Sequence, residues 1–199
     1  MLFLNTHNAA LCGAGGTAPF RPVKLIRIPQ TGQATFYTCG VAALQSVLYH
    51  NGIECSQDVL ELAVGTTPQQ GTGMEDIRKF LNDKGVRAEI RENMTLRDLK
   101  VCIDLDRVVI CIIQAWDDED DHDYSDTWND GHYAIAIGYD DKRVYFMDPY
   151  TIANYTYIEN EILLTRWHAL NRGVRYIKAG IVVTNHNPVY KQDAFIEMK

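Results

Sequence analysis

Apolar residues in the first half of the chain recur at helical spacing. In residues 39–50, Val41, Leu44 and Val47 lie three residues apart, which predicts a helix. Thr38 stands where a residue caps the start of a helix, and Asn51-Gly52 stands where a helix ends. The same reasoning predicts three more helices, over residues 56–63, 74–83 and 95–104.

The second half of the chain has the pattern of a sheet. Residues 108–116 form an apolar run with few charges, which is typical of a buried strand. Residues 132–139 and 143–147 predict two more strands, joined by a tight turn at 140–142. Shorter strands are expected at 23–28, 86–90 and 175–184, and a helix at 159–170. Helices followed by strands predict an α+β fold, with an N-terminal helical lobe packed on a C-terminal antiparallel sheet.

The chain is expected to contain one folded domain. Its 199 residues are enough to bury a single sizeable core. Residues 1–22 are rich in glycine, alanine and proline and predict a flexible N-terminal arm. The domain is then expected over residues 23–184, followed by a polar tail at 185–199.

Charge and hydropathy exclude several classes of function. The formal net charge is −7, so the chain repels phosphate backbones and nucleic-acid binding is not expected. No apolar run approaches the roughly 20 residues that span a bilayer. The first residues have no basic region typical of a signal peptide, which favours a cytoplasmic location.

The chain contains five cysteines, an odd number, and none of them forms a C-x-x-C pair. This argues against a disulfide framework and against a structural zinc site, so no metal or other cofactor is expected. Most of these cysteines are expected to be reduced and buried among apolar side chains. Cys39 differs, because it lies in the first turn of a predicted helix.

Cys39 has two predicted partners. A cysteine attacks as its thiolate, which the positive end of a helix and a neighbouring imidazole favour. His132 opens one strand of the predicted hairpin and Asp148 follows the other, so antiparallel pairing brings them together. His132 is therefore the candidate general base, and Asp148 the carboxylate that orients it. A buried histidine and a simple Asp-Pro turn are the alternative interpretations.

A glutamine precedes the predicted nucleophile. Gln33 lies six residues before Cys39, on the loop that leads into the helix. Its side-chain amide, together with the Cys39 backbone N–H, is a candidate pair of donors for the oxyanion of a tetrahedral intermediate. Gln30 lies on the same loop and is the alternative donor.

Three ordered motifs resemble the bacteriocin-processing, or double-glycine, papain-like cysteine peptidases and their stand-alone relatives. They are the segment 33–44 (QATFYTCGVAAL), Gly131-His132-Tyr133, and the segment 145–149 (YFMDP). The resemblance implies a papain-like fold, a peptide or protein substrate, and catalysis by Cys39, His132, Asp148 and Gln33 without a cofactor. The family usually has aspartate before the nucleophile, where this chain has Thr38.

Two other functions remain open. One is a papain-fold acyltransferase or amidase, in which an amine in place of water resolves the thioester. The other is a non-catalytic peptide-binding module with the same fold.

Two segments suggest additional roles. Residues 117–130 are strongly acidic, which indicates a solvated loop, a Ca²⁺ site or a surface that attracts basic substrates. Residues 13–16 (GAGG) resemble a double-glycine cleavage site, so self-processing after Gly16 competes with a simple flexible arm. Trp116, Trp128 and Trp167 are expected to be core or rim aromatic residues, and His50, His122, His168 and His186 have no convincing partner.

Overall fold

The computed structural model describes residues 21–116, 123–184, 188–195 and 197–198. The glycine-rich segment 13–16, Cys12, His122, His186 and the first part of the acidic stretch, 117–122, lie outside the described residues. The domain limits predicted above therefore stay predictions at both ends.

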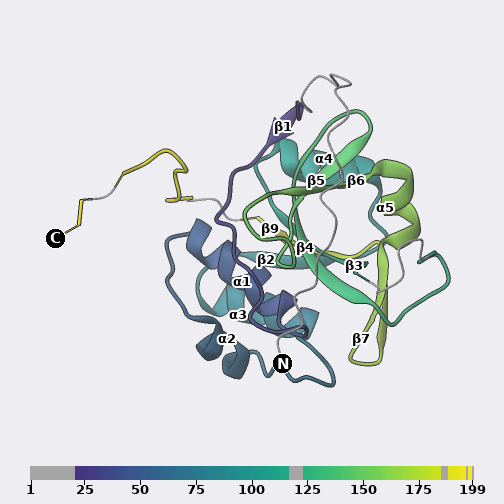
Figure 1. Cartoon of the computed structure of the whole chain (residues 1–199), viewed down its shortest axis with the longest axis horizontal. Coiled ribbons are helices and arrows are strands. Elements are labelled where there is room, and N and C mark those ends of the chain that lie inside the picture. Colours follow the sequence, from purple (N-terminus) through teal and green to yellow (C-terminus); the bar gives the residue numbers. More distant parts are fainter. Residues whose placement is uncertain (1–20, 117–122, 185–187, 196, 199) are drawn as a thin grey trace, which may run out of the picture.

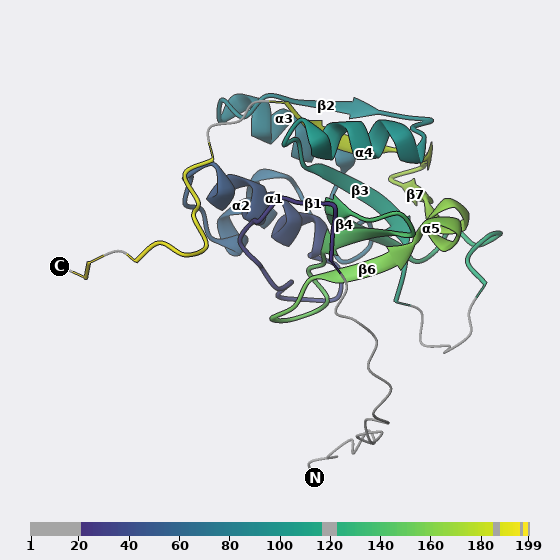
Figure 2. The ribbon, with the colours of Figure 1, turned by 90° about the horizontal axis from the view of Figure 1, so that it is seen from above.

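The helical part of the molecule is built around α1 (Cys39–His50), which has the predicted bounds. Almost all of its residues are buried, because α2 (Gln57–Ala63), α3 (Met74–Asp83) and the sheet surround it (Figures 1 and 2). The predicted cap is wrong in detail. The Thr38 hydroxyl does not cap the helix but accepts a hydrogen bond from the Thr35 backbone N–H at 2.9 Å.

The sheet is antiparallel and has one central path of six strands. In spatial order these are β2 (Ala88–Arg91), β9 (Gly180–Val183), β3 (Val109–Gln114), β4 (Gly131–Tyr139), β5 (Arg143–Met147) and β6 (Thr156–Glu159). All residues of β3 are buried, as its apolar run over residues 109–113 predicts, and the polar Gln114 at its end is buried as well. The short β1 (Lys24–Leu25) pairs with β4, so the strand predicted over 23–28 is present only in part. The helix α4 (Leu96–Asp104) packs against β4, and Thr95 caps it in a capping box.

The region after residue 159 differs from the prediction. The helix expected over 159–170 ends early, as α5 (Asn160–Arg166), and the chain continues as β7 (His168–Asn171). The single strand expected over 175–184 is two strands, β8 (Val174–Ile177) and β9. The chain turns between them at Lys178, whose φ is 47°, while the buried Trp167 indole donates to the Ala179 carbonyl at 2.9 Å. The turn at Lys178 and the hydrogen bond of Trp167 depend on tertiary contacts. The spacing of apolar residues along the chain does not predict such contacts.

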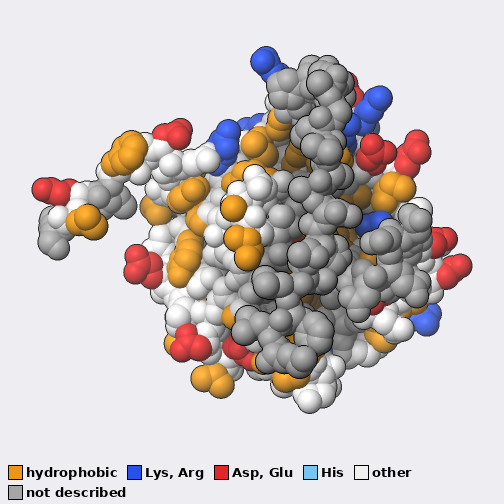
Figure 3. Space-filling view, in the orientation of Figure 1, with side chains coloured by type: hydrophobic (Ala, Val, Ile, Leu, Met, Phe, Trp, Pro, Cys, Tyr) orange, Lys and Arg blue, Asp and Glu red, His pale blue; other side chains and the backbone are white. Residues whose placement is uncertain are grey.

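Both halves of the molecule contribute to one core. Buried residues of α1, α3 and α4 pack against those of β3, β4 and β9. On the face drawn in Figure 3, the described lysine and arginine side chains are scattered among acidic and apolar ones and form no continuous basic patch. The architecture is the predicted α+β arrangement of a helical lobe packed on an antiparallel sheet.

Candidate active site

Cys39 is the first residue of α1 and is buried, with 8% of its surface exposed. The loop before it is fixed to the helix by two side chains. The Thr31 hydroxyl donates to the Ala42 carbonyl at 2.7 Å, and the Ser46 hydroxyl donates to the Pro29 carbonyl at 2.6 Å. The thiol therefore lies at the positive end of a rigid, twelve-residue helix, where an anion is favoured.

Gly40 lets the start of α1 approach the sheet. A Cβ atom at this position would lie 2.7 Å from the Thr72 Cβ and 2.9 Å from the Tyr133 Cδ2, both too close for a real contact. Tyr133 follows His132 on β4, so the close approach at Gly40 brings the cysteine to the start of that strand.

His132 and Asp148 meet at one end of the β4–β5 hairpin. Ile135 on β4 pairs with Met147 on β5, which places the start of the first strand beside the end of the second. The Nε2 atom of His132 lies 2.7 Å from Oδ1 of Asp148, and both side chains are buried. An ionised carboxylate only accepts hydrogen bonds, so Nε2 carries the proton and Nδ1 is left to interact elsewhere.

Two further groups hold the Asp148 carboxylate. The backbone N–H of Tyr150 donates to Oδ1 at 2.9 Å, and the indole N–H of Trp116 donates to Oδ2 at 3.1 Å. The Trp116 and Tyr150 rings are stacked, with their centroids 4.4 Å apart. Sequence analysis predicted Trp116 only as a core or rim aromatic residue, and no local pattern connects it with Asp148.

The electrostatics of the site favour a thiolate and an imidazolium. Burial raises the pKa of the Cys39 thiol, but the hydrogen bond and charge of His132, with backbone hydrogen bonds from Tyr133 and Gly40, lower that pKa overall. Burial lowers the pKa of His132, yet the hydrogen bonds and charges of Asp148 and Cys39 raise it to about 9. Both shifts favour the thiolate–imidazolium pair over the neutral thiol and imidazole.

Gln33 lies on the loop next to this site. Its backbone N–H donates to the Pro149 carbonyl at 2.9 Å, one residue past Asp148. Its side-chain Nε2 donates to the Thr35 carbonyl at 3.0 Å, while its Oε1 is buried without a partner among the described residues. Gln30, the alternative donor, lines a separate cavity with Tyr155 and Tyr190.

A cavity of about 430 Å³ opens beside Cys39. One side is formed by Tyr37 and by residues 68–72, which link α2 to α3. The other side is formed by the start of β4 and by the turn of the β7–β8 hairpin, at residues 170–173. With Ile112 of β3, five separate segments of the chain thus line one cleft, and the thiol lies in its wall.

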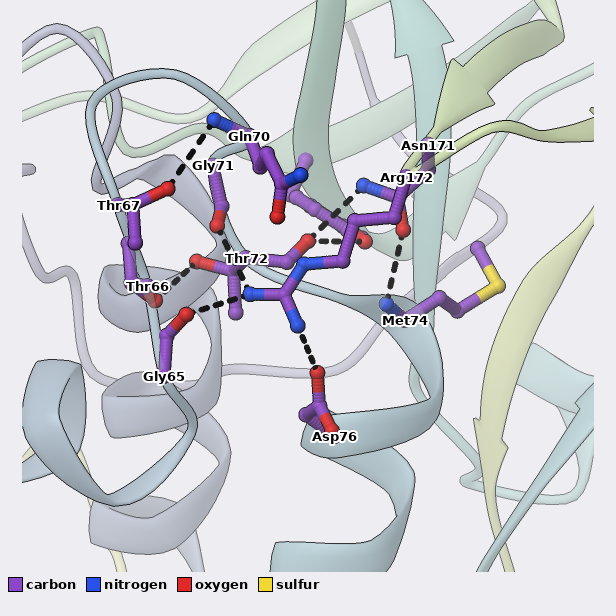
Figure 4. A network of polar contacts seen from close by, with 11 residues as sticks. Gly65, Thr66, Thr67, Gln70, Gly71, Thr72, Met74, Asp76, Asn171 and Arg172 are labelled. Carbon is purple, nitrogen blue, oxygen red and sulfur yellow. Dashed lines mark hydrogen bonds and ion pairs between the residues drawn. The ribbon is translucent and has the colours of Figure 1, made fainter.

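A polar network joins the β7–β8 turn to the loop between α2 and α3, and residues of both segments line this cleft (Figure 4). The Arg172 guanidinium donates to the carbonyls of Gly65 and Gly71 and forms an ion pair with Asp76 at 2.5 Å. The neighbouring Asn171 side chain donates to the Thr72 carbonyl and accepts from the Met74 N–H. The β7–β8 turn is therefore fixed to the loop between α2 and α3.

The described part of the acidic stretch packs against this same hairpin. Trp128 lies between the His168 ring and the Arg175 guanidinium, with centroid distances of 4.6 Å and 4.8 Å. His168, which had no partner by sequence, bonds the Thr127 carbonyl at 2.7 Å. No group of three histidine, cysteine or acidic side chains suited to a metal ion occurs among the described residues. The Ca²⁺ hypothesis was made for residues 117–130, and it stays a prediction because residues 117–122 lie outside the described residues.

The fold and the site define a papain-like architecture, with a cysteine at a helix start facing a histidine on the sheet. Residues 25–174 match the Peptidase_C39-like family, and the chain belongs to this family. Among curated proteins it resembles an uncharacterised protein of Methanothermobacter marburgensis, with 31% identity over 117 residues, covering 59% of this chain and 68% of that protein. An uncharacterised protein of Methanothermobacter thermautotrophicus is 30% identical with the same coverage.

Three solved structures have the same fold. The peptidase domain of Streptococcus ComA, a bifunctional ABC transporter of a quorum-sensing pathway, has a TM-score of 0.57 at 20% identity, covering 81% of this chain and 98% of that chain. A double-glycine-motif protease from an AMS/PCAT transporter, in complex with the leader peptide, has a TM-score of 0.55 at 17% identity, with coverages of 81% and 96%. A structure described as a C39-like peptidase from Bacillus anthracis has a TM-score of 0.61 at 17% identity, with coverages of 83% and 99%. Among the described residues, none of the helices has the length and apolar character needed to cross a membrane.

Proposed function

We propose that this protein is a cysteine peptidase that cleaves peptide bonds through a thioester on Cys39. The observation that carries the proposal is the Cys39–His132–Asp148 arrangement. In it the pKa of the thiol is lowered although the thiol is buried, with His132 as the main opposing influence. A buried structural cysteine has the opposite shift, because burial disfavours its charged form.

Acylation uses the ion pair directly. The Cys39 thiolate attacks the carbonyl carbon of the scissile bond and forms a tetrahedral oxyanion. His132, which is protonated because its pKa is about 9, gives its proton to the leaving amine as the C–N bond breaks. The products of this step are a free amine and a thioester on Cys39.

Deacylation reverses the proton transfer. The now neutral His132 removes a proton from water, and the resulting hydroxide attacks the thioester carbonyl. The C–S bond breaks, the carboxylic acid leaves, and the thiolate–imidazolium pair is restored. In both steps the Cys39 backbone N–H and one Gln33 amide N–H are the proposed donors to the oxyanion. The Gln33 Nε2 carries two protons and Thr35 accepts one of them, so one remains for this role.

The proposed substrate is an extended polypeptide segment. The cleft beside Cys39 is lined by five chain segments and is open to solvent, as suits a peptide bound across it. A protein of the same fold, named as a double-glycine-motif protease, has been solved in complex with a leader peptide, which supports a peptide ligand here.

The test is digestion of a peptide library, read by mass spectrometry, with wild type, Cys39→Ala and Cys55→Ser. We expect Cys39→Ala to lose all turnover with a nearly unchanged melting temperature, since Cys39 is a small side chain at the edge of the core. Cys55→Ser is the matched control and should cut normally, because Cys55 lies outside the site. Wild-type turnover by Cys39→Ala would contradict the proposal.

The same experiment separates the alternative functions. Digestion with an added amine nucleophile yields acids if water resolves the thioester, and amides if the protein is an acyltransferase. Binding of peptides without any product in the wild-type digest would instead identify a non-catalytic peptide-binding module.

A further inference from the structure

We propose that Trp116 is a positioning residue of this site. Its indole N–H holds the Asp148 carboxylate in the orientation that keeps His132 aligned with Cys39. The inference rests on the proposed function, since it assigns a role within the same catalytic group. Trp116 lies just after β3, 32 residues before Asp148. It is outside the β4–β5 hairpin, which carries His132 and ends just before Asp148.

The hydrogen bonds of Asp148 show why a third donor matters. Oδ1 accepts from His132 Nε2 at 2.7 Å and from the Tyr150 N–H at 2.9 Å. Oδ2 accepts from Trp116 Nε1 at 3.1 Å. A carboxylate anchored at both oxygens cannot rotate without losing a charge-assisted hydrogen bond, and buried carboxylates retain such bonds strongly. The Trp116 indole thus fixes which oxygen faces His132.

The backbone at Trp116 is unusual. Its φ is 67°, in the left-handed region that bulky side chains rarely adopt. The conformation aims the indole at Asp148 and places its ring on Tyr150, with an interplanar angle of 23°. Backbone strain of this kind persists where surrounding contacts require it, and it concentrates at functional sites.

The stacked pair also lies between Asp148 and the surface. Trp116 and Tyr150, which both bond Asp148, are 48% and 55% exposed, whereas His132 and Asp148 are 6% and 5% exposed. The hydrogen bond between His132 and Asp148 is therefore made in a partly dry environment, where it is stronger than in water.

The test removes the indole N–H and measures the state of the thiol. The rate of Cys39 alkylation by iodoacetamide is followed against pH, with mass spectrometry to distinguish Cys39 from the other cysteines. In Trp116→Phe we expect the acidic limb of this profile to move to higher pH, because a less ordered Asp148 stabilises the imidazolium less well. We also expect kcat on a cleaved peptide to fall about tenfold with KM changed less than about threefold.

Two comparisons make the result specific. Trp128→Phe is the matched control, because Trp128 packs on His168 and Arg175 away from Asp148, and it should leave the profile unchanged. Replacing Trp116 by 3-benzothienylalanine keeps the ring size and the stack on Tyr150 but removes the N–H. It should reproduce the Trp116→Phe shift, and it serves as the test if Trp116→Phe does not fold.

The outcomes separate this inference from the proposed function. If the wild-type Cys39 profile is that of an ordinary thiol, the proposed function itself fails. If the wild-type profile shows an activated thiol but both Trp116 replacements match Trp128→Phe, the positioning role is overturned.

Discussion

At the scale of single residues, the environment decides which cysteine becomes reactive. Cys39 and Cys111 are both buried. Burial raises the pKa of Cys111, which lies within β3 among apolar side chains. Burial also raises the pKa of Cys39, but His132 and the backbone hydrogen bonds to the thiol lower this pKa by more. The thiol at the helix start is therefore suited to nucleophilic attack, and the thiol in the sheet is not.

Asp148→Asn tests the role assigned to the carboxylate. Asparagine can still accept from His132, but its NH₂ group then faces the indole N–H of Trp116, and the negative charge is lost. The pKa of His132 should fall, because Asp148 contributes to raising it. We expect kcat to drop at least about tenfold and the alkaline limb of its pH profile to move to lower pH.

The measurement is kcat against pH on a cleaved peptide, with Asp141→Asn as a control. Asp141 lies in the turn at the other end of the β4–β5 hairpin, so its replacement should leave the profile as it is. An Asp148→Asn profile that overlays the wild type would show that the carboxylate does not act on His132.

At the scale of elements, the site depends on three units: the start of α1, the β4–β5 hairpin and the β7–β8 hairpin. The first two were predictable from sequence. The helix spacing of 39–50 and the tight turn at 140–142 are local signals, and antiparallel pairing then brings His132 to Asp148. The β7–β8 hairpin was missed, because its strands have only four residues each, β8 is mostly exposed, and the helix before it continues the same apolar spacing.

Arg172→Ala tests whether the β7–β8 hairpin supports the cleft. The substitution removes the hydrogen bonds to Gly65 and Gly71 and leaves Asp76 without its ion pair (Figure 4). The network is partly exposed, so we expect a loss of only about 1–2 kcal/mol in the free energy of unfolding. We also expect KM to rise more than kcat falls, because the cleft wall loosens while the catalytic group stays in place.

Arg78→Ala is the matched control for this prediction. Arg78 pairs with Glu75 within α3 at the surface, and such a pair contributes little to stability. Urea unfolding and peptide kinetics on both variants provide the comparison. If both substitutions change KM equally, the β7–β8 turn has no specific role in substrate binding.

At the scale of the whole molecule, the cleft joins segments from both lobes. Phe36 and Tyr37 come from the helical side. The sheet side contributes residues 170–173 together with Asn129, Gly131 and Tyr133. The sequence predicted the α+β class and the grouping of Cys39, His132 and Asp148. It did not predict the contact of Trp116 with Asp148 or the Arg172 network, because these join residues far apart in the chain with no shared period or motif.

The central claim is that His132 converts Cys39 into a thiolate, and the alkylation rate of Cys39 against pH tests it most directly. In the wild type we expect the rate to stay high as the pH falls well below about 8.5, where free thiols lose their charge. This expectation follows the direction of the two shifts, a lowered pKa for the Cys39 thiol and a pKa raised to about 9 for His132. In His132→Ala the alkylation rate should instead fall at the higher pH at which an ordinary or buried thiol becomes protonated. Wild-type and His132→Ala profiles that coincide would contradict the account.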